Sequence, residues 1–163
     1  MTFEEYQKAA VSFRTDTANN EEYLTLGLIA EVGEAAGKLA KRRRDGVWDE
    51  KAFIKELGDI LWFVANLADY YDRKNGLSYS FQLRDCFEMT GVSKLADKEM
   101  MEYLAFDLAG LVKGFGGMDN IIHKLSCLAK RQGYTLEQVA EINIAKLRDR
   151  AARGVIKGNG DER

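Results

Sequence analysis

The feature that most restricts the fold of this chain is the complete absence of proline from its 163 residues. Proline is the strongest breaker of a helix interior, so its absence permits long, uninterrupted helices. Strand-like alternation of apolar and polar residues is sparse, and residues 77–83 (LSYSFQL) form the only weak candidate for a strand. The sequence therefore predicts an all-α fold, with the helices packed as a bundle.

Capping residues and glycines divide the chain into the expected helices. Thr2 and Thr135 each stand three residues before a Glu or Gln, which is the spacing of a capping box, and Gly46 is placed to end a helix. Residues 76–97 are ambiguous, and we expect short helical pieces and turns there. The expected helices span about 2–18, 21–44, 50–74, 98–113, 118–131 and 136–152.

Length and charge narrow the class of protein. A chain of this length suits one domain with a sizeable core, so we expect residues 1–163 to form a single helical domain with a flexible tail at about 154–163. The net charge of −2 gives no global basic field, so we expect no nucleic-acid partner. No apolar run reaches about 18 residues and the N-terminus has no apolar signal core. We therefore expect no membrane partner and a cytoplasmic location.

Two pairs of carboxylates lie inside otherwise apolar stretches of sequence. Glu31 and Glu34 form one pair, and Glu56 and Asp59 form the other. Residues three apart share a face of a helix, and ionised side chains are costly to bury without a partner. The connection around Gly46 is short, so the two helices are expected to be antiparallel neighbours whose acidic faces meet.

Four clustered carboxylates repel one another, so either some stay protonated or cations lie between them. Oxygen ligands favour Mg²⁺ or Mn²⁺, and a chain with one histidine (His123) and two cysteines (Cys86 and Cys127) nearly excludes a zinc site of the Cys/His kind. A di-iron bundle needs E-x-x-H motifs, and His123 follows no such glutamate. A single E-x-x-E pair is typical of a solvated helix face, whereas two pairs on consecutive apolar helices favour a metal site. Residues 114–117 (GFGG) lack the pattern of a phosphate-binding loop.

The residues that carry these acids resemble a known family. The order E31-x-x-E34, 21 residues and E56-x-x-D59, with the surrounding LGLIAEVGEAAGKL and KELGDILWFVANLA, is similar to the signature of the MazG-like, all-α nucleoside triphosphate pyrophosphohydrolases. The ending EINIAKLRDRAARGVIKGNGDER resembles the N-x-x-K-x-x-x-R ending of the same family. The resemblance covers about 22–74 and 134–163, whereas residues 77–133 depart from it.

The resemblance implies an enzyme that hydrolyses a (deoxy)nucleoside triphosphate between the α- and β-phosphates, giving the monophosphate and pyrophosphate. It also implies a homodimer or a larger homo-oligomer, and Mg²⁺, for which Mn²⁺ can substitute, as the cofactor. One alternative within the family is a phosphoribosyl-ATP pyrophosphohydrolase. Another is a non-catalytic helical interaction module with a vestigial metal site. The implied metal ligands are Glu31, Glu34, Glu56 and Asp59, with Glu31 or Glu34 as the catalytic proton acceptor.

Other residues are candidates for contacts with substrate. By resemblance, Lys146 and Arg150 hold phosphates, and Asn143 contacts sugar or phosphate; without the family, this helix face reads as solvated. Lys38 can reach a phosphate or pair with Glu34 one turn before it.

Two further candidates lie on the helix of the second acid pair. Trp62 can stack on a base or simply pack in the core, and Asn66 can hydrogen-bond the base. The basic run at 41–44 (KRRR) complements a helix dipole, although one of its members can also reach the triphosphate.

Residues 77–133 contain a possible internal repeat. EYLAFDLAGLVKGFGG at 102–117 resembles EYLTLGLIAEVGEAAG at 22–37, so that Leu111 takes the place of Glu31 and Gly114 the place of Glu34. The region is either a degenerate duplication that has lost its acids or a coincidence of helical patterning. If it is a duplication, it could replace helices of a partner subunit.

Overall fold

A computed structural model describes residues 1–76, 79–88, 93–113 and 117–155 of the chain. Within these residues the secondary structure is helical and contains no strand, which confirms the predicted all-α class. The elements in chain order are α1 (Phe3–Ser12), the 3₁₀ turn η1 (Asp16–Ala18), α2 (Glu21–Asp45), α3 (Glu50–Asn75), α4 (Tyr79–Glu88), α5 (Asp97–Val112), α6 (Met118–Arg131) and α7 (Leu136–Ala152).

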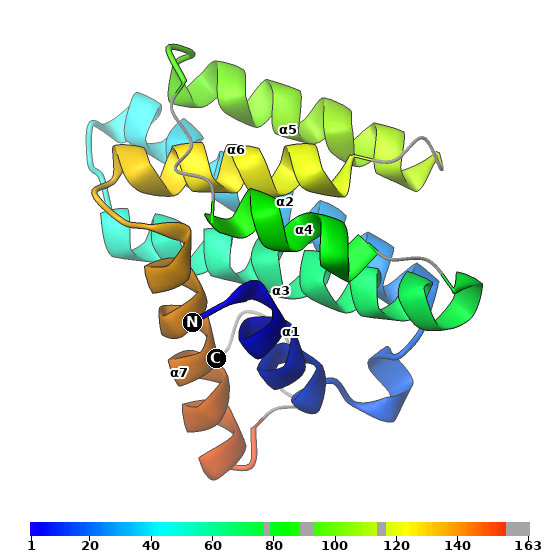
Figure 1. Cartoon of the computed structure of the whole chain (residues 1–163). Coiled ribbons are helices and arrows are strands. Elements are labelled where there is room, and N and C mark those ends of the chain that lie inside the picture. Colours follow the sequence, from blue (N-terminus) through cyan, green and yellow to red (C-terminus); the bar gives the residue numbers. More distant parts are fainter. Residues whose placement is uncertain (77–78, 89–92, 114–116, 156–163) are drawn as a thin grey trace.

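Helix α3 is the central element of the molecule. It packs against α1, α2, α4, α6 and α7, and half of its 26 residues are buried (Figure 1). Helix α5 completes a ring of four, because α2 packs on α3, α3 on α6, α6 on α5 and α5 on α2. Helices α1, α4 and α7 contact one another, and α1 and α7 lie on the side of α3 away from α5. A helix surrounded in this way is expected to be apolar on most of its surface, as the sequence of α3 is.

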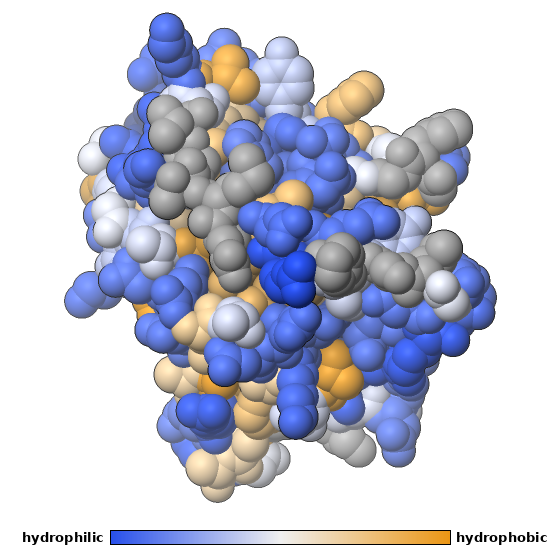
Figure 2. All heavy atoms as spheres, viewed as in Figure 1, coloured by the Kyte–Doolittle hydropathy of each residue, from blue (hydrophilic) through white to orange (hydrophobic). Residues whose placement is uncertain are grey.

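Apolar burial holds this arrangement together. A single cluster of buried hydrophobic residues runs through the described helices, and its largest fully buried side chains include Tyr6, Phe3 and Phe53. The face of the molecule seen in Figure 2 is mostly hydrophilic, with hydrophobic atoms visible only in separate areas. Among the described residues, no helix is both long enough and apolar enough to span a membrane.

The capping signals identify several helix ends correctly. Thr2 accepts a hydrogen bond from the backbone N–H of Glu5, and the Glu5 carboxylate accepts one from the Thr2 N–H in return. Asn20 caps α2 through the N–H of Tyr23 at 2.8 Å. Gly46 ends α2 in the left-handed region at φ 71°, which glycine adopts without strain.

The first helix is shorter than predicted. The apolar pattern predicted one helix over 2–18, but α1 ends at Ser12 and the chain turns before η1. Ser12 donates a hydrogen bond to the Ala9 carbonyl at 2.6 Å, and the Thr15 and Thr17 hydroxyls lie 3.1 Å apart. Short polar side chains of this kind compete with helical hydrogen bonds, and here they help to redirect the backbone.

The ambiguous region contains a helix rather than the weak strand candidate. Helix α4 begins at Tyr79 because Asp72, near the end of α3, supplies its cap. The Asp72 carboxylate accepts hydrogen bonds from the backbone N–H groups of Tyr79 at 2.6 Å and Ser80 at 3.0 Å. Local alternation over 77–83 could not reveal a cap from the preceding helix. The predicted GFGG loop and glycine-rich tail lie largely outside the described residues.

Candidate functional site

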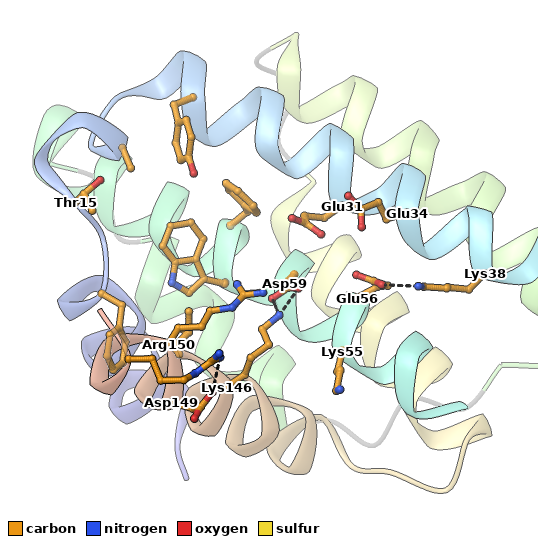
Figure 3. Close-up of a pocket in the computed structure, with 17 residues that line it drawn as sticks. Thr15, Glu31, Glu34, Lys38, Lys55, Glu56, Asp59, Lys146, Asp149 and Arg150 are labelled. Carbon is orange, nitrogen blue, oxygen red and sulfur yellow. Dashed lines mark hydrogen bonds and ion pairs between the residues drawn. The ribbon is translucent and has the colours of Figure 1, made fainter. Parts of the chain in front are cut away.

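A large pocket opens between α2, α3, α7 and the segment that follows α1. Its volume is about 670 Å³. Both acid pairs line it, together with cationic side chains of α7 and aromatic side chains at the opposite end (Figure 3). The lining residues are Phe13, Thr15, Ala18, Tyr23, Glu31, Glu34, Lys38, Lys55, Glu56, Asp59, Trp62, Phe63, Lys146, Leu147, Asp149, Arg150 and Arg153.

Three of the four predicted metal ligands form a tight group. Glu31 of α2 and Glu56 and Asp59 of α3 can each offer one carboxylate oxygen, and these oxygens lie within 4.8 Å of one another. Helices α2 and α3 pack closely side by side, which brings the two predicted faces together. Glu34 lines the same pocket one turn further along α2, outside this group of three. Three oxygen donors at such spacing are suited to a hard divalent cation.

The carboxyl group of Glu31 has a strongly perturbed pKa. Burial first, and then the negative charges of Asp59, Glu34 and Glu56, raise this pKa from 4.5 to about 8, while Lys146 opposes them. Desolvation and like charges both disfavour the anion. The group therefore holds a proton near neutral pH in the absence of a cation, as expected for crowded carboxylates.

Two lysines partly neutralise the acidic group. The Lys38 ammonium lies 3.0 Å from a Glu56 oxygen, and the Lys146 ammonium contacts both oxygens of Asp59 (Figure 3). Lys38 comes from α2 and Lys146 from α7, so each ion pair ties a different helix to α3. The hydrogen bond to Glu56 first, and then the charge of Glu34, raise the pKa of Lys38, so the predicted interaction with Glu34 is present beside the ion pair with Glu56.

A buried amide also supports Asp59. Asn143 of α7 donates a hydrogen bond from its Nδ2 to Asp59 Oδ1 at 3.0 Å, and its own Oδ1 accepts one from the Tyr6 hydroxyl at 3.0 Å. Tyr6 is completely buried, and Asn143 is 2% exposed. Burial, and then the charge of Asp59, raises the pKa of Tyr6 well above its ordinary value, so its hydroxyl stays a donor.

The end of the pocket remote from Lys38 is aromatic. Phe63 lies edge-on to Trp62 with ring centroids 4.8 Å apart, and Tyr23 lies 6.0 Å from Phe63. The Trp62 Nε1 donates to the Ala10 carbonyl at 3.1 Å, which fixes the indole plane against α1. Phe13 adds a further ring from the turn after α1. Such an arrangement presents flat apolar surface to a ligand.

Of the six residues predicted to contact substrate, four line the pocket and two do not. Lys38, Trp62, Lys146 and Arg150 line it. Asn66 does not: it is fully buried, and its Nδ2 donates to the Trp62 carbonyl at 2.8 Å. Asn143 does not line the pocket either, because its amide is occupied by Asp59 and Tyr6. Both asparagines meet the requirement that a buried amide has partners, but within the protein.

The basic run at 41–44 lies away from the pocket. The Arg42 guanidinium is 4.7 Å from the Trp48 ring centroid and 3.7 Å from Asp97, and Arg44 pairs with Asp45 at 2.7 Å. Arg42 thus helps to attach the end of α2 to the start of α5. None of the residues 41–44 lines the pocket, and Arg42, Arg43 and Arg44 stand in the last turn of α2, which favours the dipole interpretation over the alternative of a phosphate contact.

Sequence reasoning missed residues at both edges of the site. Phe13, Thr15 and Tyr23 line the aromatic end, and Lys55 lies beside the acids. No spacing rule could identify Phe13 or Thr15, because the helix was expected to continue through them. Lys55 directly precedes Glu56 and was detectable as a cation adjoining the acidic motif.

Comparison with known proteins gives the class of the central segment. Residues 19–97 match the family model of the MazG nucleotide pyrophosphohydrolase domain. This segment contains α2 and α3 with all four predicted acids. Over residues 19–97 the chain is therefore MazG-like, which confirms the resemblance seen at about 22–74. The match also extends to residue 97, into the region expected to depart from the family, whereas the resemblance at 134–163 lies outside it and stays a prediction. The α7 wall and the turn after α1 lie outside the matched segment.

One curated relative also matches. The "Gene 37 protein" of Mycobacterium phage L5 is 40% identical over 62 residues, covering 35% of this chain and 54% of that protein. The match thus spans about half of the length of the relative. No solved structure gives a significant match.

Proposed function

We propose that this chain is a metal-dependent nucleoside triphosphate pyrophosphohydrolase, which cleaves a (d)NTP between the α- and β-phosphates to give the (d)NMP and pyrophosphate. The observation that carries the proposal is the close group of Glu31, Glu56 and Asp59 in a pocket that also holds cations and aromatic rings. The MazG match of residues 19–97 supports the pyrophosphohydrolase class.

The acidic group fits a hard divalent cation, and we propose Mg²⁺, with Mn²⁺ as a substitute. Glu31, Glu56 and Asp59 would be the ligands, and Glu34, which faces the same pocket, would complete the set. When bound, the ion would neutralise the carboxylates, polarise phosphate oxygens and lower the pKa of water.

Glu31 is the best candidate for the proton acceptor. Without a cation its pKa is about 8, and a bound cation would favour the ionised form, which can accept a proton. Glu34 is the second candidate, because it lines the pocket and is more exposed to a water molecule. Either carboxylate would take the proton of the water that attacks the α-phosphorus.

The cationic side of the pocket suits the phosphate chain. Arg150 and Lys146 lie on one face of α7, and Lys38 and Lys55 lie on α2 and α3. Among the described residues, no carboxylate lies within ion-pair distance of Arg150, so its guanidinium is free to take a phosphate in a two-pronged hydrogen bond. Lys146 would hold Asp59 and approach a phosphate oxygen from the same position.

The aromatic end suits the nucleobase. Trp62, Phe63, Tyr23 and Phe13 surround it, and a base stacked there would leave its phosphates directed toward the acids. Base stacking on an aromatic side chain typically contributes about 1–3 kcal/mol, so this end would supply much of the affinity for the nucleoside.

The decisive experiment is an assay of each common NTP and dNTP with and without Mg²⁺, in which nucleotide products and pyrophosphate are separated by chromatography. We expect Mg²⁺-dependent release of pyrophosphate, reduced at least 100-fold by Glu31→Gln or Asp59→Asn. Glu22→Gln changes an exposed carboxylate of the same helix outside the pocket and should keep wild-type activity. Release of orthophosphate and diphosphate nucleotide, or of nothing, would refute the proposal.

The predicted homodimer or larger homo-oligomer, the cytoplasmic location and the single-domain boundary at 1–163 stay predictions. A non-catalytic interaction module would bind cations at the acidic group without turnover. The assay separates that alternative from an enzyme.

A further inference from the structure

A chain of two hydrogen bonds links α1 to the acidic group through α7. The Tyr6 hydroxyl donates to Asn143 Oδ1, and Asn143 Nδ2 donates to Asp59 Oδ1, each at 3.0 Å. Tyr6 does not line the pocket and lies outside the segment matched to the MazG domain. The hydrogen-bonded route from Tyr6 to the site passes through Asn143.

The amide of Asn143 can satisfy both neighbours in only one orientation. A carboxylate accepts and does not donate, so Asp59 requires the NH₂ side of the amide. The Tyr6 hydroxyl donates to the opposite, carbonyl side. Without the Tyr6 hydroxyl, the Asn143 amide keeps only its hydrogen bond to Asp59. The amide can then rotate about the Cβ–Cγ bond, because the rotational preference of this bond is broad.

Close packing brings Asn143 within reach of Asp59. A Cβ on Gly58 would lie 3.0 Å from the Asn143 Cβ, so α3 and α7 approach each other closely where α3 has no side chain. Asp59 is the next residue along α3 and faces the pocket. Lys146, one turn further along α7, contacts the same carboxylate. Asp59 is therefore held by two α7 side chains, one cationic and one neutral.

We propose that Tyr6 is a positioning residue for the metal site, which fixes the carboxylate of Asp59 by fixing the amide of Asn143. The inference rests on the proposed function, because it assigns Asp59 to a divalent cation. The neutral amide leaves the charge of Asp59 available to that cation, whereas a second lysine would compete with it. Outer partners that orient a ligand typically change metal affinity by about 10–100-fold when they are removed.

The test is binding of Mn²⁺ alone, followed by the EPR signal of the free ion, in wild type and Tyr6→Phe. The variant keeps the ring, which stacks 6.4 Å from Phe87, and loses only the hydroxyl. We expect Mn²⁺ to bind about 10-fold more weakly. Tyr71→Phe is the matched control: it removes a hydroxyl that donates to Glu21 at 3.0 Å, outside the pocket, and should leave Mn²⁺ affinity unchanged.

A double-mutant cycle shows whether the effect passes through the amide. In an Asn143→Ala background, Tyr6→Phe should weaken Mn²⁺ binding no further, because the connecting group is gone. Melting temperatures measured without metal report any loss of folding separately. Wild-type Mn²⁺ affinity in Tyr6→Phe overturns the positioning role alone. Failure of the wild-type protein to bind Mn²⁺ overturns the metal site and this role with it.

Discussion

At the scale of single residues, the acidic group was the most predictable part of the molecule. Four carboxylates at two fixed spacings within apolar helices can hardly be explained without a shared site, and three of them do converge. Glu34 lies outside that group, whereas Glu56 and Asp59, which are also three residues apart, both belong to it. Spacing therefore predicts a shared face without fixing which oxygens meet.

The raised pKa of Glu31 predicts how stability depends on pH without metal. The folded protein holds a proton that the unfolded chain releases, between pH 4.5 and about 8. The free energy of unfolding should therefore fall as pH rises through this window. Glu31→Gln should flatten the fall, as measured by urea unfolding at several pH values. Glu22→Gln should keep the wild-type slope, and an equally steep fall in Glu31→Gln would contradict the prediction.

Tyr6 could not have been recognised from the sequence. It lies 137 positions from Asn143, and its apolar spacing with Phe3 and Ala10 indicates only a core position. The same limit applies to Asn66 and Asn143, whose buried amides were expected to contact substrate. A sequence shows that an amide in an apolar helix needs partners, but it does not show whether they belong to the protein or to a ligand.

At the scale of helices, periodicity and caps predicted most elements, and the exceptions have tertiary causes. Helix α4 depends on a cap from α3, and α1 stops early where Ser12 and the threonines bond locally. Helices α2 and α3 form one hairpin, and α5 and α6 form a second that packs on it. This pairing is what an internal duplication would produce, and Leu111, in the place of Glu31, is buried. The duplication itself stays a prediction.

Two glycines of α2 give a matched test of how the aromatic end is built. A Cβ on Gly27 would lie 2.2 Å from Phe63 Cε1, whereas a Cβ on Gly33 would meet nothing within 4 Å. Gly27→Ala should displace the Phe63 ring, lower the free energy of unfolding by about 1–3 kcal/mol and raise the KM for nucleotide. Gly33→Ala should increase stability by up to about 1 kcal/mol.

Urea unfolding and steady-state kinetics of the two glycine variants check this prediction. Because both substitutions add the same methyl group to the same helix, helix propensity cancels in the comparison. Equal stability changes in the two variants would show that Phe63 moves aside without cost. An unchanged KM in Gly27→Ala would show that the Phe63 ring does not contribute to nucleotide binding.

At the scale of the whole molecule, one chain supplies every described wall of the pocket. Helix α2 and helix α3 carry the acids, α7 carries Lys146 and Arg150, and the turn after α1 carries Phe13. Helix α7 and the turn after α1 lie outside residues 19–97, the segment that matches the MazG domain. The sequence could not assign the walls to one chain or two, because helical patterns do not specify whether packing is within or between chains.

This organisation predicts the result of mixing two inactive variants. Glu31→Gln removes an acid of α2, and Lys146→Ala removes a cation of α7. If each pocket belongs to one chain, co-expression of the two variants restores no pyrophosphate release, whatever the oligomeric state. Recovery of a substantial fraction of wild-type activity would show that α7 of one chain serves the acids of another.

The charged lining of the pocket has a consequence for what can enter it. Five acidic and five basic side chains face the same space, so the cavity is close to electroneutral when all are ionised, and slightly positive when Glu31 holds its proton. A free divalent cation or a free triphosphate would each disturb that balance in one direction. A triphosphate that carries its cation brings a smaller negative charge than the free triphosphate. The balance of the lining therefore favours entry of the nucleotide together with its ion over entry of the free triphosphate.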